Sequence, residues 1–352
     1  MTNHASPIPK ILLWIFITLA SGLTAGFAGP PELRLPTDNT ALFTGNQSGF
    51  YMYTDREFEG VRSKPWTGGK YGYTRNQKRT SSGIVFTRFH EGVDIRPVRR
   101  DSSGRALDEV RSIGAGKIVH VSNDSSRSSY GRYVVVRHDW GDGAFFSLYG
   151  HLQTIVVKVG QRVSPGTNLG QMGCTGWAGN RDIARSHVHL ELNLMAHDRF
   201  KTWHDASYRS PNHHGIYNGL NLIGLDVAGL LNATRNDPSL TLPQFVGRMI
   251  PYFKVTVPKA GTDVDLITNY PWLTAGKSTR GGSSWELTLS RSGVPLAVAA
   301  SDRVVSGPTI TWVLPSKTLH SYHTRGRLTG SGSRAGLSDS GKRYIDLLTG
   351  RF

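Results

Sequence analysis

The chain has 352 residues, more than the roughly 100–200 of a typical domain, so we expect two folded units. Its one cysteine, Cys174, excludes an intrachain disulfide framework. The formal net charge of +16 favours anionic polymers as partners. The basic residues are scattered, however, and no helix-turn-helix, zinc-finger or ribonucleoprotein motif is evident, so nucleic acid is not an expected partner.

Residues 1–28 have the pattern of a secretory signal peptide. Lys10 precedes an apolar run over residues 11–23, and Gly26-Phe27-Ala28 offers a small-residue cleavage site. The run is shorter than the roughly 20 residues of a membrane span, so no stable span is expected after cleavage; an uncleaved anchor is the alternative. Export without disulfides is typical of a bacterial envelope protein, so we expect a periplasmic or secreted location, where anionic envelope polymers are at hand.

The middle of the chain is rich in short strand patterns. Residues 29–70 are polar and rich in Thr, Gly and Pro, and we interpret them as an N-terminal lead-in that packs against a catalytic sheet. Residues 71–200 alternate apolar runs with turn signals, which predicts a β-rich domain. The expected strands there are 117–121, 133–137, 145–149 and 154–159.

The character of the chain changes at about residue 201. Residues 201–352 mix helix and strand patterns, so the expected fold class is β-rich with an additional C-terminal mixed α/β region, for which wall or partner binding is one interpretation. The Gly-Ser tract at 330–333 has the composition of a linker or mobile loop. The expected elements are helices at 242–250 and 342–348 and strands at 253–257, 285–290 and 294–298, the last two joined as a hairpin.

Three short histidine motifs are the parts of the sequence that indicate a chemical function. They are His90-Glu91-Gly92-Val93-Asp94, Tyr149-Gly150-His151-Leu152 and His187-Val188-His189. Alternate side chains of a strand leave on one face, so His187 and His189 are expected to lie together, and His90 and Asp94 share a face if their motif is one strand. Imidazole nitrogens and carboxylate oxygens of this kind hold zinc and leave a fourth position for water.

The first motif is not the helical zinc motif His-Glu-x-x-His. Its fifth residue is Asp94, and Gly92 with its β-branched neighbours favours a strand. Glu91 is therefore not assigned as a general base. Gly92, between the two candidate ligands, has no side chain to crowd a metal.

Residues 71–193 resemble the LytM/lysostaphin-like zinc endopeptidases, the M23 peptidases that cut peptidoglycan peptides. Four motifs in the same order carry the resemblance: His90-x-x-x-Asp94, Tyr149-x-His151-Leu152, the run from Val159-Gly160-Gln161 to Gly173, and His187-x-His189-Leu190. The resemblance implies an antiparallel β-sheet catalytic domain, with Zn²⁺ held by His90, Asp94 and His189 and with His151 and His187 acting in catalysis. The stretch 174–186 is longer than is common in the family, which leaves the substrate preference open and suggests a cleft-wall loop.

The expected function is that of a zinc metalloendopeptidase that hydrolyses peptide bonds of bacterial peptidoglycan with zinc-activated water. His151 or His187 would accept the proton of the water and return it to the leaving amine, and either could be the principal base. Tyr149 is either a group that orients these histidines or a packing residue. The alternative functions are a non-catalytic envelope scaffold that binds peptidoglycan or activates another wall hydrolase, and a basic polymer-binding protein with incidental histidines.

Overall fold

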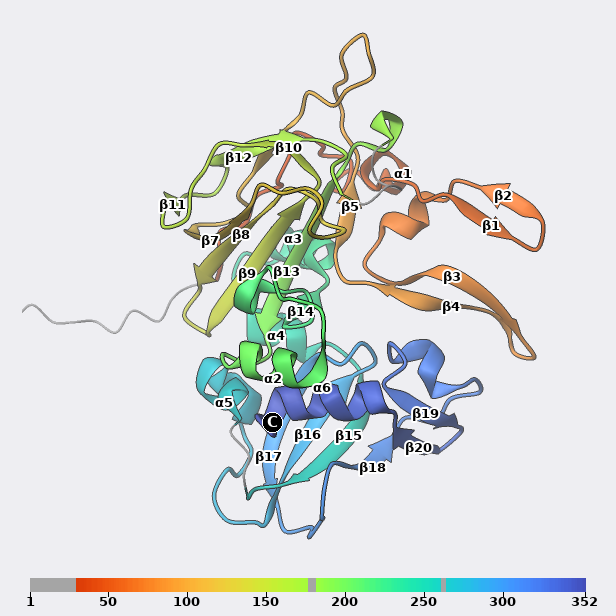
Figure 1. Cartoon of the computed structure of the whole chain (residues 1–352), viewed down its shortest axis with the longest axis vertical. Helices are drawn as coiled ribbons and strands as arrows, with labels where there is room; N and C mark the ends of the chain where they lie inside the picture. Colours follow the sequence, from red (N-terminus) through yellow and green to blue (C-terminus); the bar gives the residue numbers. More distant parts are fainter. Residues whose placement is uncertain (1–29, 177–181, 261–263) are drawn as a thin grey trace, which may run out of the picture.

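A large antiparallel sheet forms the centre of the upper half of the molecule (Figure 1). The computed structural model describes residues 30–176, 182–260 and 264–352, so the predicted signal peptide, 1–28, lies outside the described residues. The strand order is β11-β7-β8-β9-β13-β14, and β5 also pairs with β13. The strands are β5 (Val93–Ile95), β7 (Gly116–Ser122), β8 (Tyr133–Asp139), β9 (Ala144–Gly150), β11 (Arg162–Val163), β13 (Val188–Met195) and β14 (Leu222–Leu225).

The two faces of this sheet bury different residues. Strand β8 sends Val134 and Val136 into the main core and sends Tyr133 and Val135 to the opposite face. That opposite face carries a second, smaller apolar cluster, which continues through Phe146 of β9. The division follows from the alternation of side chains along each strand. The expected β-rich, antiparallel architecture is confirmed.

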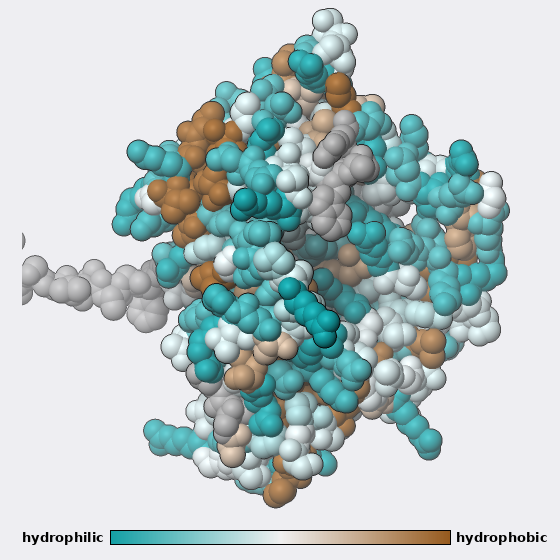
Figure 2. Space-filling model, in the orientation of Figure 1, coloured by the Kyte–Doolittle hydropathy of each residue, from teal (hydrophilic) through white to brown (hydrophobic). Residues whose placement is uncertain are grey.

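A three-stranded sheet, in the order β10-β12-β6, and the hairpins β1-β2 and β3-β4 complete the first half of the chain. Their strands are β1 (Arg56–Phe58), β2 (Val61–Ser63), β3 (Gly72–Thr80), β4 (Gly83–His90), β6 (Glu109–Arg111), β10 (Leu152–Ile155) and β12 (Asn168–Met172). The predicted strand at 154–159 is wrong beyond Ile155, because the chain leaves the sheet there to reach the turn at Gly160, whose φ is 91°. Val156 and Val159 are therefore exposed, in the area where Figure 2 shows an apolar patch on a mainly hydrophilic face.

The N-terminal lead-in lies against the large sheet. The short helix α1 (Gln47–Phe50) buries Phe50, and Met52 N donates to Asp94 O at 2.7 Å. Gly69, at the end of the turn η1 (Trp66–Gly69), has no room for a side chain, because a Cβ there would lie 2.3 Å from Met52 O. These close contacts hold residues 50–69 against the strand that carries Asp94.

The C-terminal region combines a four-stranded antiparallel sheet, β17-β16-β15-β18, with a hairpin, β19-β20, and helix α6. The strands are β15 (Pro251–Pro258), β16 (Ser284–Ser290), β17 (Pro295–Ser301), β18 (Thr309–Val313), β19 (Leu328–Ser331) and β20 (Arg334–Leu337). The helices of the second half are α2 (Phe200–Ser207), α3 (Val227–Asn236), α4 (Leu242–Gly247), α5 (Asp265–Asn269) and α6 (Asp339–Thr349). Helices α2 and α3 were not expected from the sequence.

Local sequence explains most of these boundaries. Helix α4 begins at a capping box between Thr241 and Gln244, and α6 ends at Gly350, which has a φ of 63°. The prediction of a linker at 330–333 is wrong, because these residues form the turn of the β19–β20 hairpin, where Gly332 adopts a φ of 63°. Gly-Ser composition here supplies a tight turn rather than a flexible tether.

One tyrosine of the C-terminal region is inserted into the large sheet. Tyr270, fully buried, accepts a hydrogen bond from Met195 N of β13 and donates one to Ala144 O of β9, each at 2.8 Å. Buried residues of both halves, such as Leu192 and Leu287, belong to one continuous apolar cluster. The two halves are therefore packed as one body. Within residues 30–176, 182–260 and 264–352, no helix is long and apolar enough to cross a membrane.

Candidate metal centre

Three side chains from three strands converge at one end of the large sheet. His90 is the last residue of β4, Asp94 lies in the middle of β5, and His189 is directly opposite Asp94 in β13. Asp94 Oδ1 lies 2.9 Å from His189 Nδ1 and 3.2 Å from His90 Nε2, and all three side chains are buried. One ligand atom from each residue lies within 4.8 Å of the others, which is the arrangement of a possible metal site.

The first motif is not a single strand as expected. Strand β4 ends at His90 and β5 begins at Val93, so the chain bends at Glu91 and Gly92 and the two ligands sit on different strands. Gly92 has a different function from the one expected. A Cβ there would lie 2.4 Å from Leu190 O, so glycine lets β5 approach β13 closely. The close approach brings Asp94 beside His189.

Each ligand histidine is oriented by a hydrogen bond on its far side. His90 Nδ1 donates to Lys70 O at 2.9 Å, and since a carbonyl can only accept, Nε2 is left to face the site. His189 Nε2 lies 2.8 Å from Glu191 Oε1, which leaves Nδ1 for the site. Such outer partners fix the tautomer and the ring orientation of metal-binding histidines.

The electrostatics of the three residues suit a cation. Burial opposes ionisation of Asp94, but His90 and Arg75 hold the pKa of this carboxyl well below its usual range. Burial also opposes a charge on His189, yet Asp94 and Glu191 raise its pKa to about 10. The pocket therefore stabilises positive charge at this point. Two imidazoles and one carboxylate are a donor set that zinc accepts, so these residues fit a zinc ion.

His151 and His187 lie beside this group with their rings 4.6 Å apart. His151 Nδ1 donates to Thr175 O at 2.7 Å, and His187 Nδ1 donates to Arg185 O at 2.6 Å. Both imidazoles therefore keep Nε2 as a free acceptor, and His187 Nε2 lies 3.6 Å from Asp94 Oδ1. Burial, and for His151 also the neighbouring imidazoles, lowers the pKa of both side chains. The lowered pKa favours the neutral form of both imidazoles, so each Nε2 is unprotonated.

The two carbonyls that orient these histidines come from the two ends of the long stretch 174–186. Residues 177–181 of the expected cleft-wall loop lie outside the described residues. Of its described ends, Thr175 orients His151, and the turn η3 (Ile183–Arg185) orients His187. Both ends of this stretch therefore contribute directly to the site.

Three residues near the site were not expected from the sequence. Arg75 of β3 donates to Asp94 Oδ2 at 2.5 Å and to Gly68 O at 2.7 Å. Tyr130 has its ring centroid 5.5 Å from that of His189. The third residue is Glu191. It alone could have been predicted from the sequence, because it lies two residues beyond His189 and thus on the same face of the strand.

Tyr149 is a packing residue. Its hydroxyl lies in the main core on the opposite face, where it accepts from Ile113 N at 2.8 Å and from Ser147 Oγ at 2.9 Å. It makes no contact with His151 or His187 among the described hydrogen bonds. Of the two interpretations of this tyrosine, packing is the one that the geometry favours.

Comparison with known proteins agrees with the motifs. The family model described as Peptidase family M23 matches residues 88–200, a span that includes all five predicted site residues. Residues 88–200 form an M23 peptidase domain. The match leaves the lead-in and the C-terminal region outside the M23 domain.

Curated relatives match part of the chain. The chain is 28% identical over 118 residues to the lipoprotein NlpD/LppB homolog of Pseudomonas aeruginosa, covering 32% of this chain and 34% of that protein. It is 27% identical over 107 residues to the uncharacterized lipoprotein YgeR of Escherichia coli, covering 30% and 36%. The chain thus spans about a third of the length of these relatives.

Solved structures with similar segments include two that are catalytic domains by title. The catalytic domain of the antimicrobial peptidase lysostaphin from Staphylococcus simulans is 21% identical, with 44% of this chain and 86% of that one covered and a TM-score of 0.25. The prophage-encoded M23 protein EnpA from Enterococcus faecalis is 22% identical, with 40% and 79% covered and a TM-score of 0.25.

Proposed function

We propose that the protein is a zinc metalloendopeptidase that hydrolyses peptide bonds of bacterial peptidoglycan. The observation that carries this proposal is the convergence of His90 Nε2, Asp94 Oδ1 and His189 Nδ1, with two further histidines beside them. His187 Nε2 lies 3.6 Å from Asp94 Oδ1, and the His151 ring neighbours the rings of His187 and His189. A zinc ion held by these three atoms would supply Lewis acidity that activates water and polarises a peptide carbonyl.

The chain's own residues would carry the protons. His151 and His187 present unprotonated Nε2 atoms, because each Nδ1–H is donated to a backbone carbonyl. Either could accept a proton from the attacking water and return it to the amine of the departing peptide. The partner of each Nδ1 is a fixed backbone atom, so both rings keep their orientation during the transfer.

A non-catalytic envelope scaffold is the alternative. It would need no proton acceptor beside the metal ligands, whereas here both histidines are buried and oriented, His187 Nε2 lies 3.6 Å from Asp94 Oδ1, and the His151 ring lies 4.6 Å from that of His187. We therefore favour the enzyme. The predicted signal peptide supports a periplasmic or secreted location, where peptidoglycan is the available substrate.

Anionic envelope polymers are proposed as additional partners. Residues 207–352 carry 16 Lys and Arg against 8 Asp and Glu, an excess of positive charge that attracts polyanions. Binding of this kind weakens as salt screens the charges beyond about 8–10 Å.

The direct test measures metal and hydrolysis on the same preparation. We expect about one zinc per chain, release of peptide fragments from purified peptidoglycan, loss of both after chelation, and recovery of both with added zinc. Mass analysis of the fragments would identify the bond that is cut. Full hydrolysis by a preparation that metal analysis shows to be zinc-free would contradict the proposed mechanism.

A further inference from the structure

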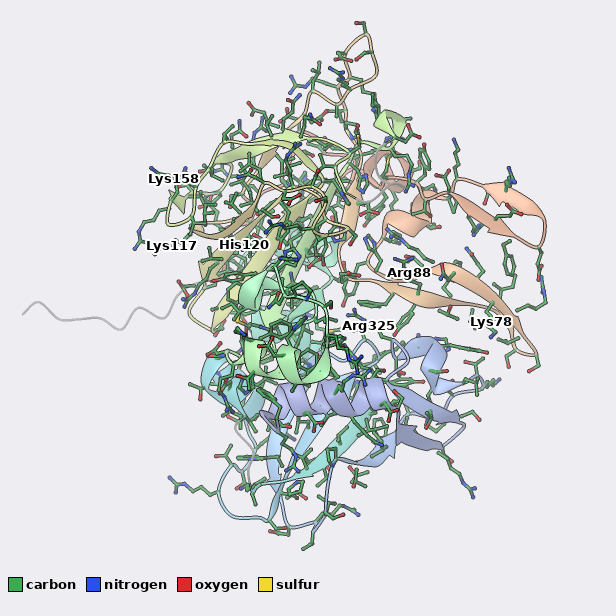
Figure 3. All side chains as sticks on the ribbon, in the orientation of Figure 1. Lys78, Arg88, Lys117, His120, Lys158 and Arg325 are labelled. Carbon is green, nitrogen blue, oxygen red and sulfur yellow. The ribbon has the colours of Figure 1, made fainter. Side chains whose placement is uncertain are left out.

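A small cavity rich in arginine lies between the segment around α2 and β14, the last strand of the large sheet, and helix α6. Its volume is about 150 Å³. One wall comes from α2 and from the segment 219–223 that leads into β14; the other comes from residues 325–327 and α6. Arg325, Arg327 and Arg343 line it, and none of the described residues around it is acidic. Figure 3 shows Arg325 between α6 and the β3–β4 hairpin.

Arg327 is held rigidly in this cavity. Its guanidinium carbon lies 3.4 Å from the centroid of the Tyr344 ring, and its Nη1 donates to Ser292 O at 2.6 Å. Tyr344 is fixed in turn, because its hydroxyl donates to Gly293 O at 2.7 Å. Burial lowers the pKa of Arg327 to about 10, and the neighbouring charge of Arg325 acts in the same direction. The cavity thus holds a buried positive charge without a carboxylate beside it.

The other two arginines are not neutralised either. Among the described residues, no carboxylate forms an ion pair with Arg325, Arg327 or Arg343. Glu91 lies within range of the charge of Arg325 but makes no contact with it. Arginines that line one cavity without forming an ion pair are a common composition of a site for carboxylate or phosphate.

The cavity adjoins the candidate metal centre on two sides. Arg325 N donates to Tyr73 Oη at 2.9 Å, and its guanidinium lies 5.4 Å from the ring centroid of Phe89, the residue before His90. On the other side, a Cβ on Gly219 of the cavity wall would lie 2.9 Å from Tyr130 Oη, and the Tyr130 ring neighbours His189. Phe89 and Tyr130 thus neighbour both the cavity residues and the histidines of the candidate metal centre.

We propose that this cavity binds a small oxyanion, the carboxylate of a peptide that lies across the metal centre; this inference rests on the proposed function. The volume supports a terminal group as the occupant, because it is well below the roughly 300–1,000 Å³ of a site for a whole drug-sized ligand. The phosphate of an envelope polymer has the same chemistry and is the other source of such an anion. The role assigned to the C-terminal region is thus to recognise one end of the substrate.

The first test measures binding without catalysis. The probes are N-acetylalanine, its amide and glycerol phosphate, titrated into the zinc-loaded full chain and followed by NMR line broadening. We expect the acid to bind and the amide not to bind. Arg343→Gln and Arg325→Gln should each weaken binding of the acid by about ten- to a hundredfold, the range for hydrogen bonds to charged groups. Binding should survive chelation of the zinc, because no cavity residue is a metal ligand.

Lys342→Gln is the matched control. Lys342 is the neighbour of Arg343 on α6, carries the same charge and does not line the cavity. Its substitution should leave binding unchanged. Equal loss in Lys342→Gln and Arg343→Gln would indicate general charge attraction and overturn the proposal. Arg343-dependent binding of glycerol phosphate without binding of N-acetylalanine would show a polymer site and would also overturn the substrate assignment.

The second test uses hydrolysis. The substrates are peptidoglycan fragments with a free peptide carboxylate and the same fragments after amidation. The KM of the free acid should be about tenfold lower than the KM of the amide. Arg343→Gln should remove this difference and leave kcat within about twofold. If zinc-loaded protein cuts the fragments but Arg343→Gln has no effect on KM, the substrate role of the cavity is wrong and the proposed function stands. If no fragment is cut, the proposed function and with it the substrate assignment fail, whereas an oxyanion site found in the first test would remain.

Discussion

Arg75 donates to Asp94 Oδ2 at 2.5 Å, while Asp94 Oδ1 faces His90 and His189. The arginine therefore determines which carboxylate oxygen is available at the metal site. It comes from β3, and its own Nε is anchored on Gly68 O at 2.7 Å. A residue 19 positions before Asp94 in the chain thus sets the orientation of this ligand.

Replacing Arg75 should weaken zinc binding. Arg75→Gln removes the charge–charge contact with Asp94, and loss of an outer partner of this type costs about 10–100-fold in metal affinity. Competition with a chelator of known affinity measures the effect. Arg88→Gln is the matched control, because Arg88 lies opposite Arg75 in the β3–β4 register and is exposed. Unchanged zinc affinity in Arg75→Gln would show that Asp94 is positioned without it.

Replacing Glu191 tests the outer partner of His189. Glu191→Gln keeps an acceptor near His189 Nε2 but removes a buried negative charge, so zinc affinity should fall about tenfold or more while the fold is retained. Glu191→Ala should weaken zinc binding further, because it also leaves His189 Nε2 without its buried acceptor and removes one of the two acceptors of Asn193 Nδ2. Zinc titration and melting temperature on both variants check this order. A Glu191→Gln protein with wild-type affinity would exclude an electrostatic role.

Mutation should distinguish the metal ligands from the proton acceptors by their effects on zinc content and on hydrolysis. His90→Ala, Asp94→Ala and His189→Ala each remove one of three protein ligands, so zinc and hydrolysis should be lost together. His151→Ala and His187→Ala should retain most of the zinc but lose hydrolysis by about 10²–10⁴-fold, the usual size of a general acid–base contribution. His187→Ala should also lose some metal affinity, because it neighbours His189.

Zinc content, melting temperature and the rate of hydrolysis should be measured on the same preparations. Together they show whether His151 acts in catalysis or only packs in the fold. A folded, zinc-loaded His151→Ala protein that turns over at the wild-type rate would refute its catalytic role. His138→Asn is a useful comparison, because His138 is equally buried but bonds to Ala115 O and Ser147 Oγ away from the site. It should change stability rather than turnover of the folded protein.

The junction between the two halves should be sensitive to a single hydroxyl. Tyr270→Phe leaves Met195 N and Ala144 O without their buried partner, so the free energy of unfolding should fall by about 1–3 kcal/mol. Tyr322→Phe is the control, since no hydrogen bond of its hydroxyl is present among the described contacts. Denaturant unfolding measures both. A Tyr270→Phe protein as stable as the control would mean that the halves are held together by other contacts.

The sequence by itself predicted which residues meet at the candidate site. The histidine motifs, together with the family resemblance that they carry, pointed to His90, Asp94, His151, His187 and His189, and the structure brings these five residues together. The central strands β7, β8 and β9 were also predictable, because short runs of β-branched and aromatic residues between turn signals are a local property. The same holds for α4 and for the end of α6, which depend on capping residues nearby.

Only the tertiary structure decided how these residues are supported. Arg75, Tyr130 and the carbonyls of Lys70, Thr175 and Arg185 reach the site from separate segments, and no local pattern distinguishes a carbonyl that orients a histidine from any other. The tract at 330–333 was misread for a related reason: glycine permits both a flexible tether and a tight turn, and pairing of β19 with β20 selects the turn. The cluster of Arg325, Arg327 and Arg343 likewise exists only because α6 packs beside the loop after η6 (His320–His323). Convergence of distant segments depends on burial and long-range pairing, which a single sequence does not encode locally.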